Sequence, residues 1–148
     1  MWISFALNPE NWLNQPFFID HVRTAYAYTE ISKSSNEFIS NYALDNLKHK
    51  WIFNAVFKLP YNFSINYNMR YYDRNGSYLS YDHMTASSFE LPYESYLLND
   101  VSVQFTSRQI AVYLDITNIF DVEYNNRGSV IQPGRWIIGG IRISPGHQ

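Results

Sequence analysis

The sequence predicts an all-β protein, an antiparallel up-and-down meander that forms one arc of a transmembrane β-barrel. Residues 61–72 alternate between apolar and polar side chains over twelve positions, enough for a bilayer-spanning strand of about 9–11 residues. Strands of soluble sheets are usually about 5–6 residues long. Very short turns also alternate with long loops along the chain, as they do in outer-membrane barrels. Aromatic residues make up 18 % of the chain, which fits the aromatic girdles of such barrels.

The composition excludes several classes of protein. The 148 residues are enough for one domain. The net charge of −2 gives no basic surface, so no nucleic-acid partner is expected. The chain has no cysteine and its four histidines lack ligand spacing, so we expect no disulfide, no metal and no cofactor. No run of about 18 apolar residues predicts a transmembrane helix. Met1 is not followed by a signal sequence, which indicates a mature chain or a piece of a longer one.

The first predicted strand lies at residues 19–30, after a stretch, residues 1–18, whose pattern is ambiguous. Within that stretch, residues 2–7 are compatible with the end of a strand and Asn8-Pro9 with a turn. One face of the predicted strand carries Val22, Thr24, Tyr26 and Tyr28. The Ser- and Asn-rich residues 31–46 are predicted to form a loop.

Two strands are then predicted at residues 47–59 and 61–72, with a turn at 59–61 between them. Pro60 ends the first strand because it cannot donate to a β-ladder. In the second strand the odd positions form an apolar wall: Tyr61, Phe63, Ile65, Tyr67, Met69 and Tyr71. The even positions form a polar wall: Asn62, Ser64, Asn66, Asn68 and Arg70.

Three further strands are predicted at residues 98–106, 109–118 and 136–144. A long loop at 73–97, which opens on the Asn75-Gly76 turn pair, precedes them. A tight turn at 106–109 and a loop at 119–134 separate them. Because outer-membrane barrels have short periplasmic turns and long external loops, the alternation also predicts strand direction. The strands predicted to run outward are those at 19–30, 61–72 and 109–118.

The loop at 73–97 and its edges hold the candidate ligand-binding residues. Aromatic faces beside a cation and a carboxylate suit an apolar or ring-shaped ligand. The candidates are Arg74, Tyr78, Tyr81, Asp82 and Tyr93. On the polar wall, Arg70 and Asp115 are expected to join an ionic network facing the barrel lumen.

No residue is assigned a catalytic role, and we expect that the protein is not an enzyme. Four carboxylates fall in or beside the same loop: Asp73, Asp82, Glu90 and Glu94. A pair of them would suit hydrolysis, but charged side chains in a long loop are more typical of a solvated surface.

The C-terminal third of the chain resembles the end of TonB-dependent outer-membrane receptors, most closely the cobalamin- and siderophore-receptor branches. The resemblance lies in residues 114–121 (LDITNIFD), Tyr124 and residues 133–136 (PGRW). Weaker likeness extends over residues 19–144, as in Leu44-Asp45…His49-Lys50 and Tyr72-Asp73-Arg74. By this resemblance the structural motif residues are Asn118, Phe120, Asp121, Tyr124, Pro133, Gly134 and Arg135.

The resemblance implies a receptor in the outer membrane that takes up a scarce nutrient such as a cobalamin, a metal chelate or a glycan. Such receptors have about 22 strands around a plug domain, of which residues 1–148 would supply roughly the last six strands. The plug and the N-terminal strands would be absent, so the chain alone would not be transport-competent. The implied partners are outer-membrane lipid, the remaining strands and plug, TonB through the plug, and the extracellular nutrient.

Two departures from the family pattern stand at the ends of the chain. Residues 143–148 (ISPGHQ) lack the aromatic residue on which the family usually ends. Residues 1–18 lack the Gly-x-Glu segment of the strand expected before residue 19. The alternatives are a soluble β-sandwich carbohydrate-binding module that uses the loop tyrosines and, third, a hydrolase that uses the loop carboxylates.

Overall fold

The computed structural model describes residues 1–7, 18–30, 46–84, 86–126 and 128–144. These residues form nine strands and one 3-10 turn, without any α-helix, so the prediction of an all-β antiparallel fold is confirmed. Seven strands make one antiparallel sheet in the order β1-β2-β3-β4-β7-β8-β9. They are β1 (Trp2–Leu7), β2 (Ile19–Tyr28), β3 (Leu47–Leu59), β4 (Phe63–Arg74), β7 (Tyr96–Thr106), β8 (Ile110–Thr117) and β9 (Trp136–Ile143).

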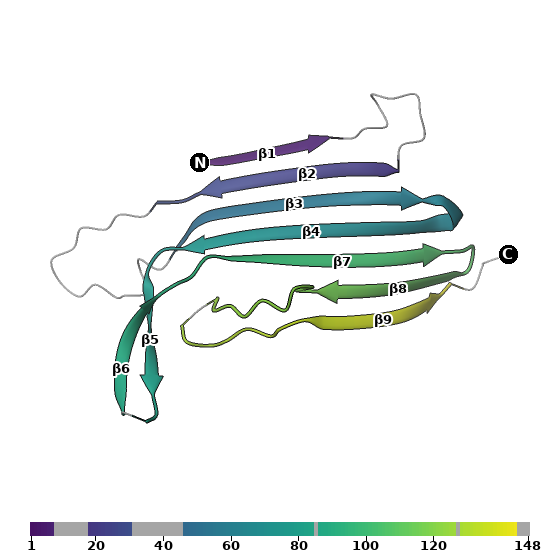
Figure 1. Cartoon of the computed structure of the whole chain (residues 1–148). Coiled ribbons are helices and arrows are strands. Elements are labelled where there is room, and N and C mark those ends of the chain that lie inside the picture. Colours follow the sequence, from purple (N-terminus) through teal and green to yellow (C-terminus); the bar gives the residue numbers. More distant parts are fainter. Residues whose placement is uncertain (8–17, 31–45, 85, 127, 145–148) are drawn as a thin grey trace.

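The large sheet is an open meander (Figure 1). Each strand pairs with its neighbour in the chain, except where the two-stranded sheet of β5 (Ser77–Asp82) and β6 (Ser87–Pro92) is inserted between β4 and β7. The described residues do not close the sheet into a barrel, because β1 and β9 each have one paired neighbour. Among the described residues, no helix is long and apolar enough to cross a membrane.

Most predicted strands coincide with observed ones. Residues 47–59 match β3, and the strands predicted at 19–30, 98–106, 109–118 and 136–144 match β2, β7, β8 and β9 closely. The strand predicted from Tyr61 begins instead at Phe63, so that boundary is wrong. Tyr61 and Asn62 both have φ of 63° and belong to the 3-10 turn η3 (Pro60–Asn62), which reverses the chain immediately after β3.

Two predictions for the remaining segments need correction. The loop at 73–97 contains the β5–β6 hairpin, entered through a turn in which Gly76 has a φ of 100°. Residues 2–7 form β1, which pairs with β2 from Leu7↔Val22 to Trp2↔Ala27, so the sheet has seven strands rather than six. The loop expected at 31–46 and the tail at 145–148 lie almost wholly outside the described residues.

The connections at the two ends of the sheet differ in length. The η3 turn and the turn at 107–109 lie at one end, hereafter the short-turn end. β1 also ends, and β2 begins, at that end. The β5–β6 hairpin and residues 118–135 lie at the other end, hereafter the long-loop end (Figure 1). The predicted alternation of short turns and long loops is therefore present from β2 to β9.

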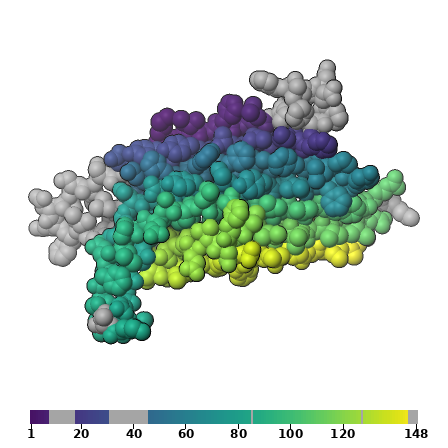
Figure 2. All heavy atoms as spheres, viewed as in Figure 1, coloured from purple at the N-terminus to yellow at the C-terminus, as the bar shows by residue number. Residues whose placement is uncertain are grey.

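The large sheet is a single layer. The space-filling view shows its strands side by side as a band, with the β5–β6 hairpin projecting from the long-loop end (Figure 2). The two sheets are therefore not stacked as a β-sandwich. Six of the described residues are buried: Ala55, Tyr93, Tyr96, Leu98, Asn99 and Asn118. A two-layer domain would bury one whole sheet face, so the described residues supply no conventional core.

Candidate ligand-binding site at the long-loop end

Aromatic rings gather where β4 ends and β7 begins. Tyr72 and Tyr96 are paired across these two strands, and their ring centroids lie 5.3 Å apart. The ring of Tyr124, from the segment after β8, lies 4.4 Å from that of Tyr96. Three elements distant in the sequence thus form one row of rings, with spacings at which aromatic pairs attract each other.

The base of the β5–β6 hairpin is attached to the segment between β8 and β9. Asn125 Nδ2 donates to the Tyr78 hydroxyl at 2.9 Å, and the Gly128 amide donates to the Tyr93 hydroxyl at 2.8 Å. The rings of Tyr78 and Tyr93 lie 5.2 Å apart. These contacts fix the position of the hairpin base relative to the row of rings.

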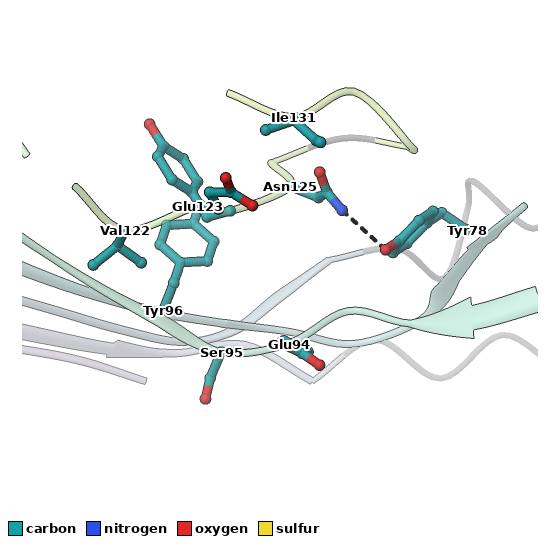
Figure 3. Close-up of a pocket in the computed structure, with 9 residues that line it drawn as sticks. Tyr78, Glu94, Ser95, Tyr96, Val122, Glu123, Asn125 and Ile131 are labelled. Atoms are coloured by element: carbon teal, nitrogen blue, oxygen red, sulfur yellow. Dashed lines mark hydrogen bonds between the residues drawn. The ribbon is translucent and has the colours of Figure 1, made fainter. Parts of the chain in front are cut away.

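A cavity of about 370 Å³ lies between these elements (Figure 3). Figure 3 shows the hydrogen bond from Asn125 to Tyr78 among the side chains that line it. The lining residues are Tyr78, Glu94, Ser95, Tyr96, Val122, Glu123, Tyr124, Asn125 and Ile131. Tyrosine faces with a few carboxylate, hydroxyl and amide groups are suited to binding a polar, ring-containing molecule.

The Tyr96 phenol is the most perturbed titratable group of this cavity. Burial first, and the neighbouring Tyr124 second, raise the pKa of Tyr96 to about 12. The hydroxyl therefore stays protonated and neutral at physiological pH. It donates a hydrogen bond to Asn126 Oδ1 at 3.3 Å.

The five candidate ligand-binding residues do not form one site. Arg74, Tyr78 and Tyr93 lie together, with the Arg74 guanidinium 5.6 Å from the centre of the Tyr93 ring. Tyr81 and Asp82 lie at the far tip of the hairpin, where Asp82 accepts a hydrogen bond from the Met84 amide. Because Tyr93 is 8 % exposed, it supports the site rather than offering a face to a ligand.

Four of the seven family-motif residues, Asn118, Asp121, Gly134 and Arg135, form a turn that brings the end of β8 close to the start of β9. Asn118, with φ of 49°, exchanges two hydrogen bonds with the backbone of Val122, at 2.9 and 3.0 Å. Asp121 Oδ1 accepts the Arg135 amide at 2.6 Å. A Cβ added to Gly134 would collide with that carboxylate, which would have to move away from the Arg135 amide.

The other motif residues have different environments. The Arg135 guanidinium donates to the Ile119 carbonyl at 3.3 Å, and Tyr124 belongs to the row of rings. Pro133 lines a second cavity of about 300 Å³ together with Arg70 and Asp100. Phe120 is 71 % exposed and makes none of these contacts.

The ionic network expected on the polar wall forms around Asp100. Arg70 Nη2 lies 2.6 Å from one Asp100 oxygen, and the Asn118 amide donates to the other at 2.9 Å. Asp115, which we expected to join Arg70, instead accepts a hydrogen bond from Ser102. The ion pair thus links β4 and β7 to the motif turn.

Some cavity residues were not among the sequence candidates. Ser95, Glu123 and Asn125 lie in segments that become neighbours only when the hairpin packs against the turn after β8. Of the loop carboxylates, Glu94 lines the cavity, whereas Asp82 is at the hairpin tip. Within the described ranges, no three His, Cys, Asp or Glu residues form a group able to hold a metal ion.

Comparison of the chain with protein-family models, with curated proteins and with solved structures found no match.

Proposed function

We propose that this chain is part of the barrel wall of an outer-membrane receptor that takes up a scarce nutrient with energy from a TonB-type partner. The single observation that carries the proposal is the opposite character of the two faces of the seven-stranded sheet. A sheet with one continuous apolar face, one polar face and no second layer is the design of a transmembrane barrel wall.

The apolar face is continuous across every strand of the sheet. One row of directly paired residues crosses all seven strands: Leu7, Val22, Ala55, Tyr67, Val101, Ile116 and Ile137. Directly opposite residues share a face, so this row lies on one side of the sheet. The adjacent row on the opposite side includes Asn66, Ser102 and Asp115, and is polar in the centre of the sheet. In the proposed receptor the first row faces lipid and the second faces the lumen.

Aromatic side chains flank this apolar band. At the long-loop end Tyr26, Trp51 and Tyr71 are paired in one row, and at the short-turn end Phe63 is paired with Phe105. On β7 the band runs from Leu97 to Phe105, nine residues, about the length of a tilted membrane-spanning strand. Tyr96 and the cavity beside it lie beyond the band, on the side assigned to the exterior.

Position and chemistry make the cavity the proposed nutrient-binding region. It lies at the long-loop end, which outer-membrane barrels expose to the medium. Transport requires more polypeptide than this sheet, because the outer edges of β1 and β9 would leave backbone groups unpaired in lipid. The remaining strands of a barrel of about 22, and a plug, are part of the proposal.

Cell fractionation tests the location, and growth tests the function. We expect the chain to sediment with the outer membrane and to resist extraction by urea. We also expect deletion of its gene to impair growth on a limiting nutrient, with no additional effect in cells that lack the TonB partner. Recovery of the chain as a soluble monomer would contradict the location, and an additive effect of the two deletions would contradict the coupling.

A further inference from the structure

We propose that the polar face of the sheet carries a binding pocket for an anionic, ring-bearing ligand. Its role in nutrient uptake rests on the function proposed above, whereas its charge preference rests only on the geometry that follows. The pocket is a cavity of about 420 Å³ at the long-loop end. Its lining residues are Leu47, Lys50, Arg70, Tyr72, Arg74, Tyr96, Leu98, Tyr124 and Asn126.

The strand pairing explains why these side chains converge. Lys50 is paired with Tyr72, Tyr72 with Tyr96, and Arg70 with Leu98. Directly paired residues share a face, so β3, β4 and β7 present these residues on the polar side. Arg74 and Asn126 complete the outer rim, where Arg74 Nη2 donates to Asn126 Oδ1 at 3.2 Å.

The pocket is positively charged. Among the described residues that line it, Lys50, Arg70 and Arg74 are cationic and none is a carboxylate, although Asp100 compensates Arg70 through their ion pair. The two glutamates of the neighbouring cavity, Glu94 and Glu123, do not line this one. Among the described lining residues the charge is therefore positive, and the Lys50 ammonium in particular favours an anion in this pocket.

The rings add a second element of recognition. Lys50 Nζ lies over the Tyr72 ring, 5.7 Å from its centre, so a cation and an aromatic ring occur together in the pocket. Tyr72 and Tyr124, which pack on either side of the buried Tyr96 ring, are the partly exposed rings against which a ligand ring can pack. A carboxylate or phosphate held by Lys50 and Arg74, with its ring against the tyrosines, uses both features.

A pair of probes with the same ring and opposite charge tests the inference. Phenyl phosphate and phenyltrimethylammonium are titrated calorimetrically into the full chain, folded in detergent micelles. We expect phenyl phosphate to bind at least about tenfold more tightly, and its affinity to fall as sodium chloride rises from about 50 to about 500 mM. This salt dependence needs no variant.

Charge-removing variants locate the site. Lys50→Gln and Arg74→Gln should each weaken phenyl phosphate binding about fivefold or more, because each removes one cation from the pocket. Arg142→Gln removes a cation from the same face of the sheet, on β9 opposite Ala111, and should leave the affinity unchanged. Arg74 also holds Asn126, so Lys50→Gln is the decisive variant if Arg74→Gln impairs folding.

The outcomes separate this inference from the proposed function. Equal affinity for the two probes, or equal effects of Lys50→Gln and Arg142→Gln, would overturn the pocket even in a chain that sediments with the outer membrane. Selective binding of phenyl phosphate that requires Lys50 would support the pocket even if the chain were recovered as a soluble protein.

Discussion

A charged residue placed on either side of one strand tests the proposal that the apolar face of the sheet meets lipid. We choose Val101 and Ser102, neighbours near the middle of β7 whose side chains lie on opposite faces. Val101 belongs to the continuous apolar row, and Ser102 is paired with Asn66 and Asp115 on the polar face. Tyr67 and Asn66 are less suitable, because Tyr67 donates a hydrogen bond to Asn99 and Asn66 accepts one from Asn54.

The expected magnitudes differ by more than the error of a folding measurement. An arginine on the lipid face at the bilayer midplane costs about 2–4 kcal/mol, so Val101→Arg should lower the folding equilibrium constant roughly 30-fold to 900-fold. Ser102→Arg loses the hydrogen bond to Asp115, worth about 1 kcal/mol, but places a guanidinium beside that carboxylate. Its net cost should stay within about 1 kcal/mol.

The assay is folding of each variant, together with the strands that complete its barrel, into phospholipid vesicles. The folded fraction is measured on a detergent gel, as the intensity of the band whose migration changes when the sample is heated. Stability is measured as the urea concentration at the midpoint of unfolding. The expected result is a large loss for Val101→Arg and near-normal folding for Ser102→Arg. Equal tolerance of both, or a greater loss for Ser102→Arg, would refute the assignment of the apolar face to lipid.

Three further predictions address the motif turn, the topology and the free edges. Gly134→Ala should lower stability by about 1–3 kcal/mol in urea unfolding, because its Cβ displaces Asp121 from the Arg135 amide. Gly139→Ala, whose Cβ would meet only ordinary contacts, should have a smaller effect, and the reverse order would contradict the role of the turn. A cysteine introduced at Ser88, on the hairpin, should react with an impermeant thiol reagent on intact cells, whereas a cysteine introduced at Ser107 should react only after lysis. The opposite labelling pattern would mean that the proposed strand directions are reversed. The isolated chain should aggregate in water or form strand-rich oligomers only in detergent, and a monodisperse monomer with a cooperative melt would contradict this.

Strands with long alternating patterns were predictable from the sequence because one face of each is apolar and one is polar. The predicted start of β4 was two residues too early. Tyr61 continues the apolar–polar alternation of the strand, but its backbone belongs to the 3-10 turn that begins at Pro60. The β5–β6 hairpin was missed because its strands have six residues each and lie in a polar, tyrosine-rich tract. Its formation depends on pairing between the two segments, such as Tyr78 with Leu91, which neither segment signals alone.

The candidate site was predictable in its residue types but not in its arrangement. Alternation and loop position indicated that tyrosines would gather near residues 73–97, but not that Tyr93 would be buried while Tyr81 stays at the hairpin tip. The hairpin base is held by hydrogen bonds from Asn125 to Tyr78 and from Gly128 to Tyr93, and both donors come from a different loop. The motif resemblance did identify residues that meet in space, since Asn118, Asp121, Gly134 and Arg135 form one turn.

The odd number of strands in the large sheet limits what can complete a barrel. Because the sheet has seven alternating strands, with β1 and β9 as its edges, these two strands run in the same direction, from the long-loop end to the short-turn end. For antiparallel pairing at both edges, the first and last strands of the added segment must both run opposite to β1 and β9. An antiparallel segment of this kind has an odd number of strands, so the whole barrel would have an even number. A second copy of this sheet, inserted in the same orientation, would meet the first through parallel seams. A closed, fully antiparallel barrel thus needs further strands beyond the seven described in this sheet.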